Sequence, residues 1–107
     1  MALRTRTINP NHRISTRIAA KLTCVCPVNG RRDFATVEVI YTPAGSVVEL
    51  ESFATWLSSY ATEVVGHEEI TEAIADEIDD VAMPDALTVR TTWNAVEGVE
   101  CIVSTRR

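Results

Sequence analysis

Polar and apolar residues alternate in the middle and at the end of the chain, and between these parts apolar residues recur at every third or fourth position. Residues 34–41 (FATVEVIY) are rich in β-branched and aromatic types, which predicts a strand, and a turn separates it from a short strand at residues 46–50. Two more strands are expected at residues 86–96 and 99–105, with a hairpin turn at Glu97–Gly98.

Helical periodicity occupies the region between these pairs of strands. Apolar residues spaced three and four apart predict one amphipathic helix over residues 53–64, and Gly66 is expected to end it as a C-cap. A second apolar stripe predicts a helix over residues 70–81, which Met83–Asp85 terminates because proline cannot continue a helix.

The resulting order, ββααββ, predicts an α+β fold in which a four-stranded antiparallel sheet carries two helices on one face. The length of 107 residues suits a single domain over residues 1–107, with residues 1–16 as an irregular, basic N-terminal arm. Such a sheet leaves two strand edges open, and assembly of copies into a ring would cover them.

Charge is unevenly distributed along the chain. Residues 1–32 contain seven basic groups and no acid, whereas residues 33–89 contain thirteen acids and no lysine or arginine. A basic arm of this kind suits nucleic-acid phosphates, with a solvated tail as the alternative.

The composition limits the compartment and the chemistry. There is no long apolar run and no secretory signal, so we expect a cytoplasmic protein without a membrane span. An odd number of cysteines, three, in a chain without a secretory signal argues against a disulfide framework, and without CxxC or HxxxH spacing no zinc site is expected.

Reactive side chains are concentrated in two short stretches. Cys26 precedes a Pro/Gly loop, and Asp33 follows at the start of a strand, where it could take and return the proton of a nucleophilic thiol. Arg31 and Arg32 would favour the thiolate, although this spacing also fits a buried structural cysteine. The second stretch is His67–Glu68, which suits recognition of a guanine-like base or, alternatively, simple helix capping.

Together these stretches resemble the 7-cyano-7-deazaguanine reductases (QueF) and their relatives of the tunnelling-fold superfamily. The reductase pattern Cys-Pro-x-x-Gly-x-x-Asp-Phe-Ala-Thr is matched without a gap by residues 26–36, CPVNGRRDFAT. Tyr41-Thr42-Pro43 and His67-Glu68 match two further motifs of that family. The resemblance implies a tunnelling fold that assembles into rings, typically pentamers stacked in pairs.

The resemblance also implies roles for individual residues. Cys26 would attack the nitrile carbon to form a covalent thioimide, and Asp33 would be the acid/base. His67 and Glu68 would hold the 7-deazaguanine base, and Glu49 would line the same pocket.

One motif departs from the reductases. Their cofactor motif carries two lysines, and the aligned positions here are Glu51 and Ala54. Because the phosphates of NADPH need cations, this substitution argues against an NADPH cofactor. In its short length and missing lysines the chain resembles the QueF-like amidinotransferases, in which ammonia attacks the thioimide to give a formamidine of the archaeosine type.

Two alternatives to this enzyme remain at this point. The first is a reductase that recruits its cofactor through other contacts. The second is a tunnelling-fold binding or structural subunit without activity. The substrate base would be free, in tRNA or in DNA, with ammonia as co-substrate, and the basic arm favours a nucleic acid.

Overall fold

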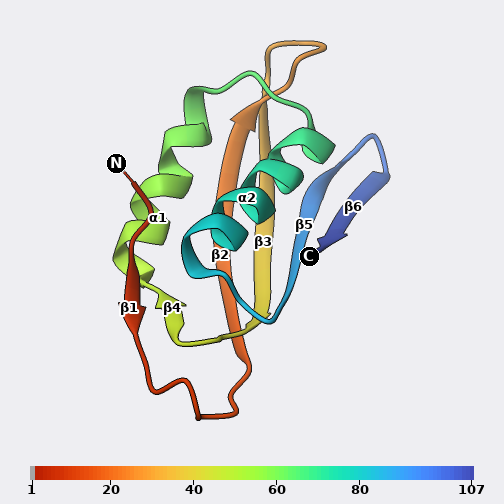
Figure 1. Ribbon diagram of the computed structural model, residues 1–107. Coiled ribbons are helices and arrows are strands. Elements are labelled where there is room, and N and C mark those ends of the chain that lie inside the picture. The colour runs from red at the N-terminus through yellow and green to blue at the C-terminus, as the bar shows by residue number, and fades with distance from the viewer. Residues whose placement is uncertain (1) are drawn as a thin grey trace.

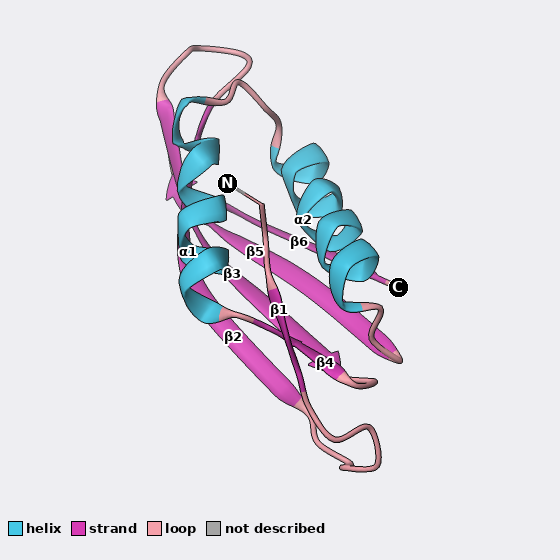
Figure 2. Cartoon of the chain, turned by 60° about the vertical axis from the view of Figure 1, so that its left-hand side comes forward, coloured by secondary structure: helices cyan, strands magenta, loops and turns pink. Residues whose placement is uncertain are grey.

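The computed structural model describes residues 2–107, and Met1 lies outside the described residues. Four long strands form one antiparallel sheet in the order β2-β3-β5-β6, with bounds Thr16–Val25, Arg32–Thr42, Ala86–Val96 and Val99–Arg106. Helices α1 (Leu50–Ser58) and α2 (His67–Ala82) lie on the same side of this sheet (Figures 1 and 2). This arrangement confirms the predicted α+β class and its four-stranded sheet with two helices on one face.

The second strand predicted from the sequence belongs elsewhere. Strand β4 (Ser46–Val48) pairs with β1 (Thr5–Thr7) in a separate two-stranded ribbon. The expectation that residues 1–16 are irregular is therefore wrong for Thr5–Thr7, whose β-branched side chains suit a strand. Leu3 is buried in the core and anchors this ribbon on the helix-covered side of the sheet.

The fourth member of the main sheet is β2, which the hydrophobic pattern did not reveal. Its residues Ile18, Leu22 and Cys24 are buried, but the charged Arg17 and Lys21 directly precede two of them on the exposed face. All ten residues of β2 pair with β3, from Thr16↔Tyr41 to Val25↔Arg32. This register sets Cys24 opposite Asp33 and carries the chain to the loop that contains Cys26.

The helix boundaries differ from those predicted. Helix α1 begins at Leu50 and passes into a short 3-10 helix, η1 (Ser59–Thr62), so it ends earlier than residue 64. Gly66 is not a C-cap but the N-cap of α2, with φ −75° and ψ 163°. The predicted hairpin is confirmed, since Glu97 and Gly98 both adopt positive φ, as a tight turn between antiparallel strands requires.

The hydrophobic core lies between the sheet and the helices. Alternate residues of β3 and β5 face the helices, and α2 contributes Ile70, Ile74 and Ile78. The opposite sheet face is uncovered in this chain and includes the Arg17–Glu38 ion pair at 2.8 Å. No helix in residues 2–107 is both long and apolar enough to cross a membrane.

Tyr41 provides a test of how the β1–β4 ribbon is attached. Its buried hydroxyl accepts a hydrogen bond from the Val48 amide at 2.9 Å. Tyr41→Phe leaves this amide without a partner, so we expect a loss of about 1–2 kcal/mol in the free energy of unfolding, measured by urea titration. Tyr60→Phe is the control, because the half-buried Tyr60 hydroxyl has no hydrogen-bond partner within residues 2–107. Equal stability of both variants would contradict this role.

Candidate active site

Cys26 lies in a closed loop between β2 and β3. The Cys26 amide donates to the Arg31 carbonyl at 2.8 Å, and the Gly30 amide donates to the Cys26 carbonyl at 3.0 Å. Gly30 has φ +72°, a left-handed conformation that glycine adopts without strain. The loop therefore holds the half-buried Cys26 side chain at the end of the sheet.

The segment before α2 is fixed against the end of β2. The Val25 amide donates to the Glu63 carbonyl at 2.8 Å, and the Val65 amide donates to the Val25 carbonyl at 3.1 Å. The thiol of Cys24 contacts the Val65 carbonyl at 3.7 Å. These contacts direct Gly66 and the first turn of α2 toward the Cys26 loop.

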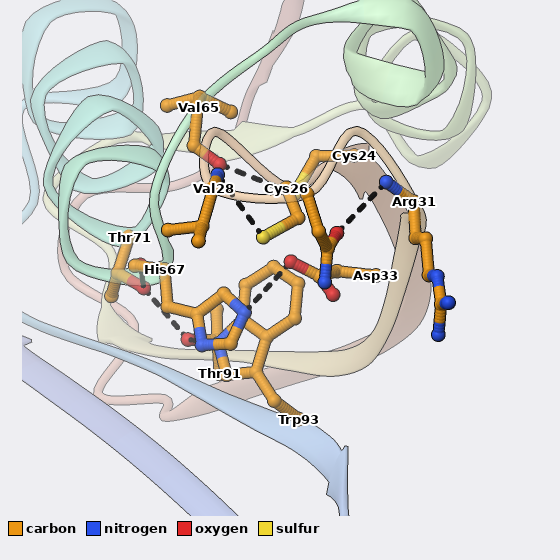
Figure 3. Close-up of polar contacts among 11 residues, drawn as sticks. Cys24, Cys26, Val28, Arg31, Asp33, Val65, His67, Thr71, Thr91 and Trp93 are labelled. Atoms are coloured by element: carbon orange, nitrogen blue, oxygen red, sulfur yellow. Dashed lines mark hydrogen bonds and ion pairs between the residues drawn. The ribbon is translucent and has the colours of Figure 1, made fainter. Parts of the chain in front are cut away.

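Asp33 and His67 form a polar pair beside this loop. His67 Nε2 lies 3.1 Å from Asp33 Oδ2, and the two side chains are 26% and 16% exposed. The His67 ring is stacked on the indole of Trp93, with centroids 3.8 Å apart and an interplanar angle of 5°. Figure 3 shows Cys26, Asp33 and His67 together, so the structure gathers three of the five predicted site residues.

One backbone amide contacts the Cys26 sulfur. The Val28 amide donates to Cys26 Sγ at 3.4 Å. Within residues 2–107 no side chain caps the N-terminus of α2, and the first turn of this helix carries Glu68 and Glu69. The thiolate is the form of cysteine that acts as a nucleophile, and the Val28 amide is placed to donate a hydrogen bond to that sulfur.

The side chains of the other two predicted site residues, Glu68 and Glu49, form no hydrogen bond with the Asp33–His67 pair within residues 2–107. Glu68 is exposed in the first turn of α2, next to His67. Glu49 directly precedes α1, and this end of α1 lies at the opposite end of the sheet from the β2–β3 loop (Figure 1). There its carboxylate accepts hydrogen bonds from Arg4 at 2.8 and 3.3 Å, which lower the pKa of Glu49. Within one chain, Glu49 is not part of the Cys26 cluster.

Three residues around His67 escaped the analysis of the sequence. Trp93 lies under the His67 ring, and buried Thr71 and Thr91 bond to one another at 2.7 Å. The available signal was Thr91, a polar residue at a buried position of the alternating β5 pattern. No three His, Cys, Asp or Glu side chains within residues 2–107 are grouped so that they could hold a metal ion.

The two neighbouring cysteines are expected to differ in reactivity. Burial, followed by the nearby Asp33 and Cys26 charges, raises the pKa of Cys24 to about 11. Cys24 therefore remains a protonated, inaccessible thiol at mildly alkaline pH. We expect iodoacetamide to label Cys26 in the native protein and to label Cys24 only after denaturation, as read by peptide mass spectrometry. Equal native labelling of both cysteines would contradict the burial of Cys24.

Comparison with known proteins agrees with this geometry. Residues 32–107 match the family described as QueF-like protein. The NADPH-dependent 7-cyano-7-deazaguanine reductase of Thermomicrobium roseum is 38% identical over 86 residues, which are 80% of this chain and 67% of the relative. The reductase of Anaeromyxobacter sp. (strain Fw109-5) is 37% identical over 86 residues, 80% of this chain and 70% of the relative.

A solved structure extends the likeness to three dimensions. The crystal structure of the archaeosine synthase QueF-Like in the apo form superposes with a TM-score of 0.82 and 26% sequence identity. The match covers 86% of this chain and 91% of that chain. It supports the tunnelling fold expected from the Cys26–Thr36 motif. By its sequence profile, its relatives and its fold, the chain belongs to the QueF-like protein family.

Proposed function

We propose that this protein is an amidinotransferase that converts the nitrile of a 7-cyano-7-deazaguanine base into a formamidine, using ammonia. The observation that carries the proposal is a half-buried cysteine beside an Asp33–His67 pair, in a chain whose α1 presents Glu51 and Ala54 to solvent. The first feature suits a thioimide, and the second does not suit the phosphates of NADPH.

The reaction can be written in two balanced steps. The Cys26 thiolate attacks the nitrile carbon, a C–S bond forms, and the nitrile nitrogen takes a proton from Asp33. Ammonia then adds to the thioimide carbon and gives a proton to Asp33. Collapse of this adduct breaks the C–S bond, releases the thiolate and leaves the formamidine. Each proton moves over a hydrogen bond, which is the role of a positioned general acid and base.

Base recognition is assigned to the start of α2. We propose that Glu68, exposed beside His67, accepts hydrogen bonds from the ring and exocyclic N–H groups of the base. His67 would border the same pocket while bonded to Asp33. If Glu49 also contacts the base, it must come from a neighbouring copy, because in one chain it lies at the far end of the sheet. The open edges of β2 and β6 would allow the ring that this requires.

A base within tRNA or DNA is the favoured substrate. Arg31 and Arg32 are exposed at the loop that carries Cys26, where they could contact phosphates flanking the modified base. Many of the acidic side chains lie on the helices, and two of them, Glu68 and Glu69, occupy the first turn of α2 beside the same site. Phosphate contact would therefore be limited to the side of the site formed by the β2–β3 loop.

Reduction is the alternative, because the two relatives described above are named as NADPH-dependent reductases. An experiment that separates the two uses the nitrile base with NADPH in one reaction and with ammonium in another. We expect no consumption of NADPH, read from its absorbance, and formamidine only with ammonium. Sustained NADPH oxidation with turnover of the base would contradict the proposal.

A further inference from the structure

A buried chain of hydrogen bonds runs beneath His67. The Trp93 indole N–H donates to Thr91 Oγ1 at 2.8 Å, and Thr91 and Thr71 bond through their hydroxyls at 2.7 Å. The Thr71 hydroxyl donates to the backbone carbonyl of His67 at 2.7 Å. Thr71 and Thr91 are 0% exposed and Trp93 is 2% exposed, so water does not compete with these bonds.

The direction of this chain follows from the number of protons. Each hydroxyl has one hydrogen to donate, and an indole N–H can only donate. Thr71 gives its hydrogen to the His67 carbonyl, so the hydrogen between the two threonines belongs to Thr91. The sequence of donors is therefore Trp93, Thr91, Thr71, with the His67 carbonyl as the last acceptor. Every member is satisfied, which makes such a buried network rigid.

The same two residues also meet at their rings. The His67 imidazole lies flat on the Trp93 indole at 3.8 Å and 5° (Figure 3). His67 is thus tied to Trp93 twice, through the threonines at its backbone and through stacking at its side chain. With the ring plane fixed in this way, the Nε2 atom is directed at Asp33 Oδ2, 3.1 Å away.

We propose that Trp93 is a positioning residue of the Cys26–Asp33 site, held in orientation by Thr91. Its indole sets the plane of the His67 ring, and the ring in turn orients the Asp33 carboxylate that exchanges protons with the nitrile nitrogen. This inference rests on the proposed function for its catalytic consequence. The geometric part, that Trp93 and Thr91 fix the His67 ring, is independent of the reaction.

Packing of the core does not by itself explain why Thr71 and Thr91 carry hydroxyls. Thr71 and Thr91 lie in a core that is otherwise almost entirely apolar, and burying a hydroxyl is unfavourable unless it is hydrogen-bonded. Valine has nearly the same shape and would fill such positions without a polar group. The hydroxyls fix the orientation of the Trp93 side chain, because the indole N–H must point at Thr91. This orientation determines which face of the indole meets His67.

The test compares variants that remove one link at a time. Trp93→Leu removes the stack, Trp93→Phe keeps an aromatic ring without the N–H, and Thr91→Val removes the hydroxyl that Thr91→Ser restores. Trp56→Phe is the control, because Trp56 is a half-buried tryptophan that packs against Tyr60 and is not part of the His67 network. For each folded variant, kcat and KM for formamidine formation and the ¹⁵N chemical shifts of the His67 ring are measured.

We expect Trp93→Leu and Thr91→Val to lower kcat by roughly 10- to 100-fold with little change in KM, because misplacement of a catalytic group costs this order of magnitude. Their His67 ¹⁵N shifts should change together with kcat. Thr91→Ser should restore both measurements, and Trp93→Phe should be intermediate. Trp56→Phe should match the unaltered protein.

Unchanged kcat and unchanged His67 shifts in folded Thr91→Val would overturn the inference, as would a loss of kcat that Thr91→Ser does not restore. If Trp93→Leu does not fold, the two Thr91 variants decide. If the unaltered protein forms no product, the proposed function fails, and the His67 shifts alone then decide whether Trp93 and Thr91 position the ring.

Discussion

Replacing Cys26 with alanine is expected to lower turnover by at least about 10⁴-fold, the scale seen when a covalent nucleophile is removed. The neighbouring Cys24 cannot replace it, because Cys24 is fully buried and its pKa is raised to about 11. The measurement is the initial rate of formamidine formation, together with the intact mass of the protein after incubation with the nitrile base. The unaltered protein should gain the mass of one base, and Cys26→Ala should gain none.

Cys101→Ala is the matched control for this experiment. Cys101 is the remaining free cysteine and lies on β6, outside the Asp33–His67 pair. We expect this variant to keep both the adduct and its activity. An adduct that survives Cys26→Ala would place the nucleophile elsewhere. Absence of any adduct on the unaltered protein would favour the binding-subunit alternative.

Replacing Asp33 with asparagine is expected to lower turnover by about 10²- to 10⁴-fold, the usual contribution of a general acid and base. The amide has nearly the same size and can still contact His67, but it cannot take up or release the proton that each step requires. Formation of the thioimide and its attack by ammonia should both slow, which single-turnover measurements with rapid quenching can separate.

Glu38→Gln is the control for Asp33→Asn. Glu38 belongs to the same strand, β3, but its carboxylate pairs with Arg17 on the uncovered sheet face. This variant should keep its activity, since a partly exposed ion pair contributes little to stability. Full activity of Asp33→Asn would show that the proton comes from another group.

The hydrophobic pattern correctly predicted those helices, strands and turns that are determined by residues close together in the sequence. Alternation along residues 34–41, the turn at Glu97–Gly98 and the helical stripe of α2 all correspond to the observed elements. The ribbon of β1 and β4 was not predicted, because its register depends on Tyr41, Val48 and the burial of Leu3, which are distant in sequence. The sequence pattern also did not show that α1 ends at Ser58, well before Gly66. Gly66 was therefore predicted to end the first helix, whereas it directly precedes α2 as its N-cap.

The candidate site likewise combines residues that are close in sequence with residues that only the fold brings together. The spacing of Cys26 and Asp33 is local, and the hairpin between β2 and β3 places both on one end of the sheet. His67 reaches them only through the contacts of Val25 with residues 63–65, which the family motif indicated but no spacing could show. Trp93 and Thr91 were missed because a buried tryptophan in a strand is ordinarily a core residue.

The surface charge near α1 bears on the choice between ammonia and NADPH in the proposed reaction. Glu51 is exposed in the first turn of α1, and Glu49 directly before it is bound by Arg4. This end of the helix therefore presents acids where the reductase motif has its first lysine. A neutral nucleophile such as ammonia needs no cationic surface, whereas the phosphates of NADPH do.

The most direct test of this account is incubation of the protein with ammonium and tRNA or DNA that contains the 7-cyano-7-deazaguanine base. The digested nucleosides are then analysed by mass spectrometry, with ¹⁵N-ammonium to trace the incoming nitrogen. The account predicts a formamidine nucleoside that carries one ¹⁵N atom and is absent with Cys26→Ala. An unchanged nitrile, or an aminomethyl product that depends on NADPH, would contradict it.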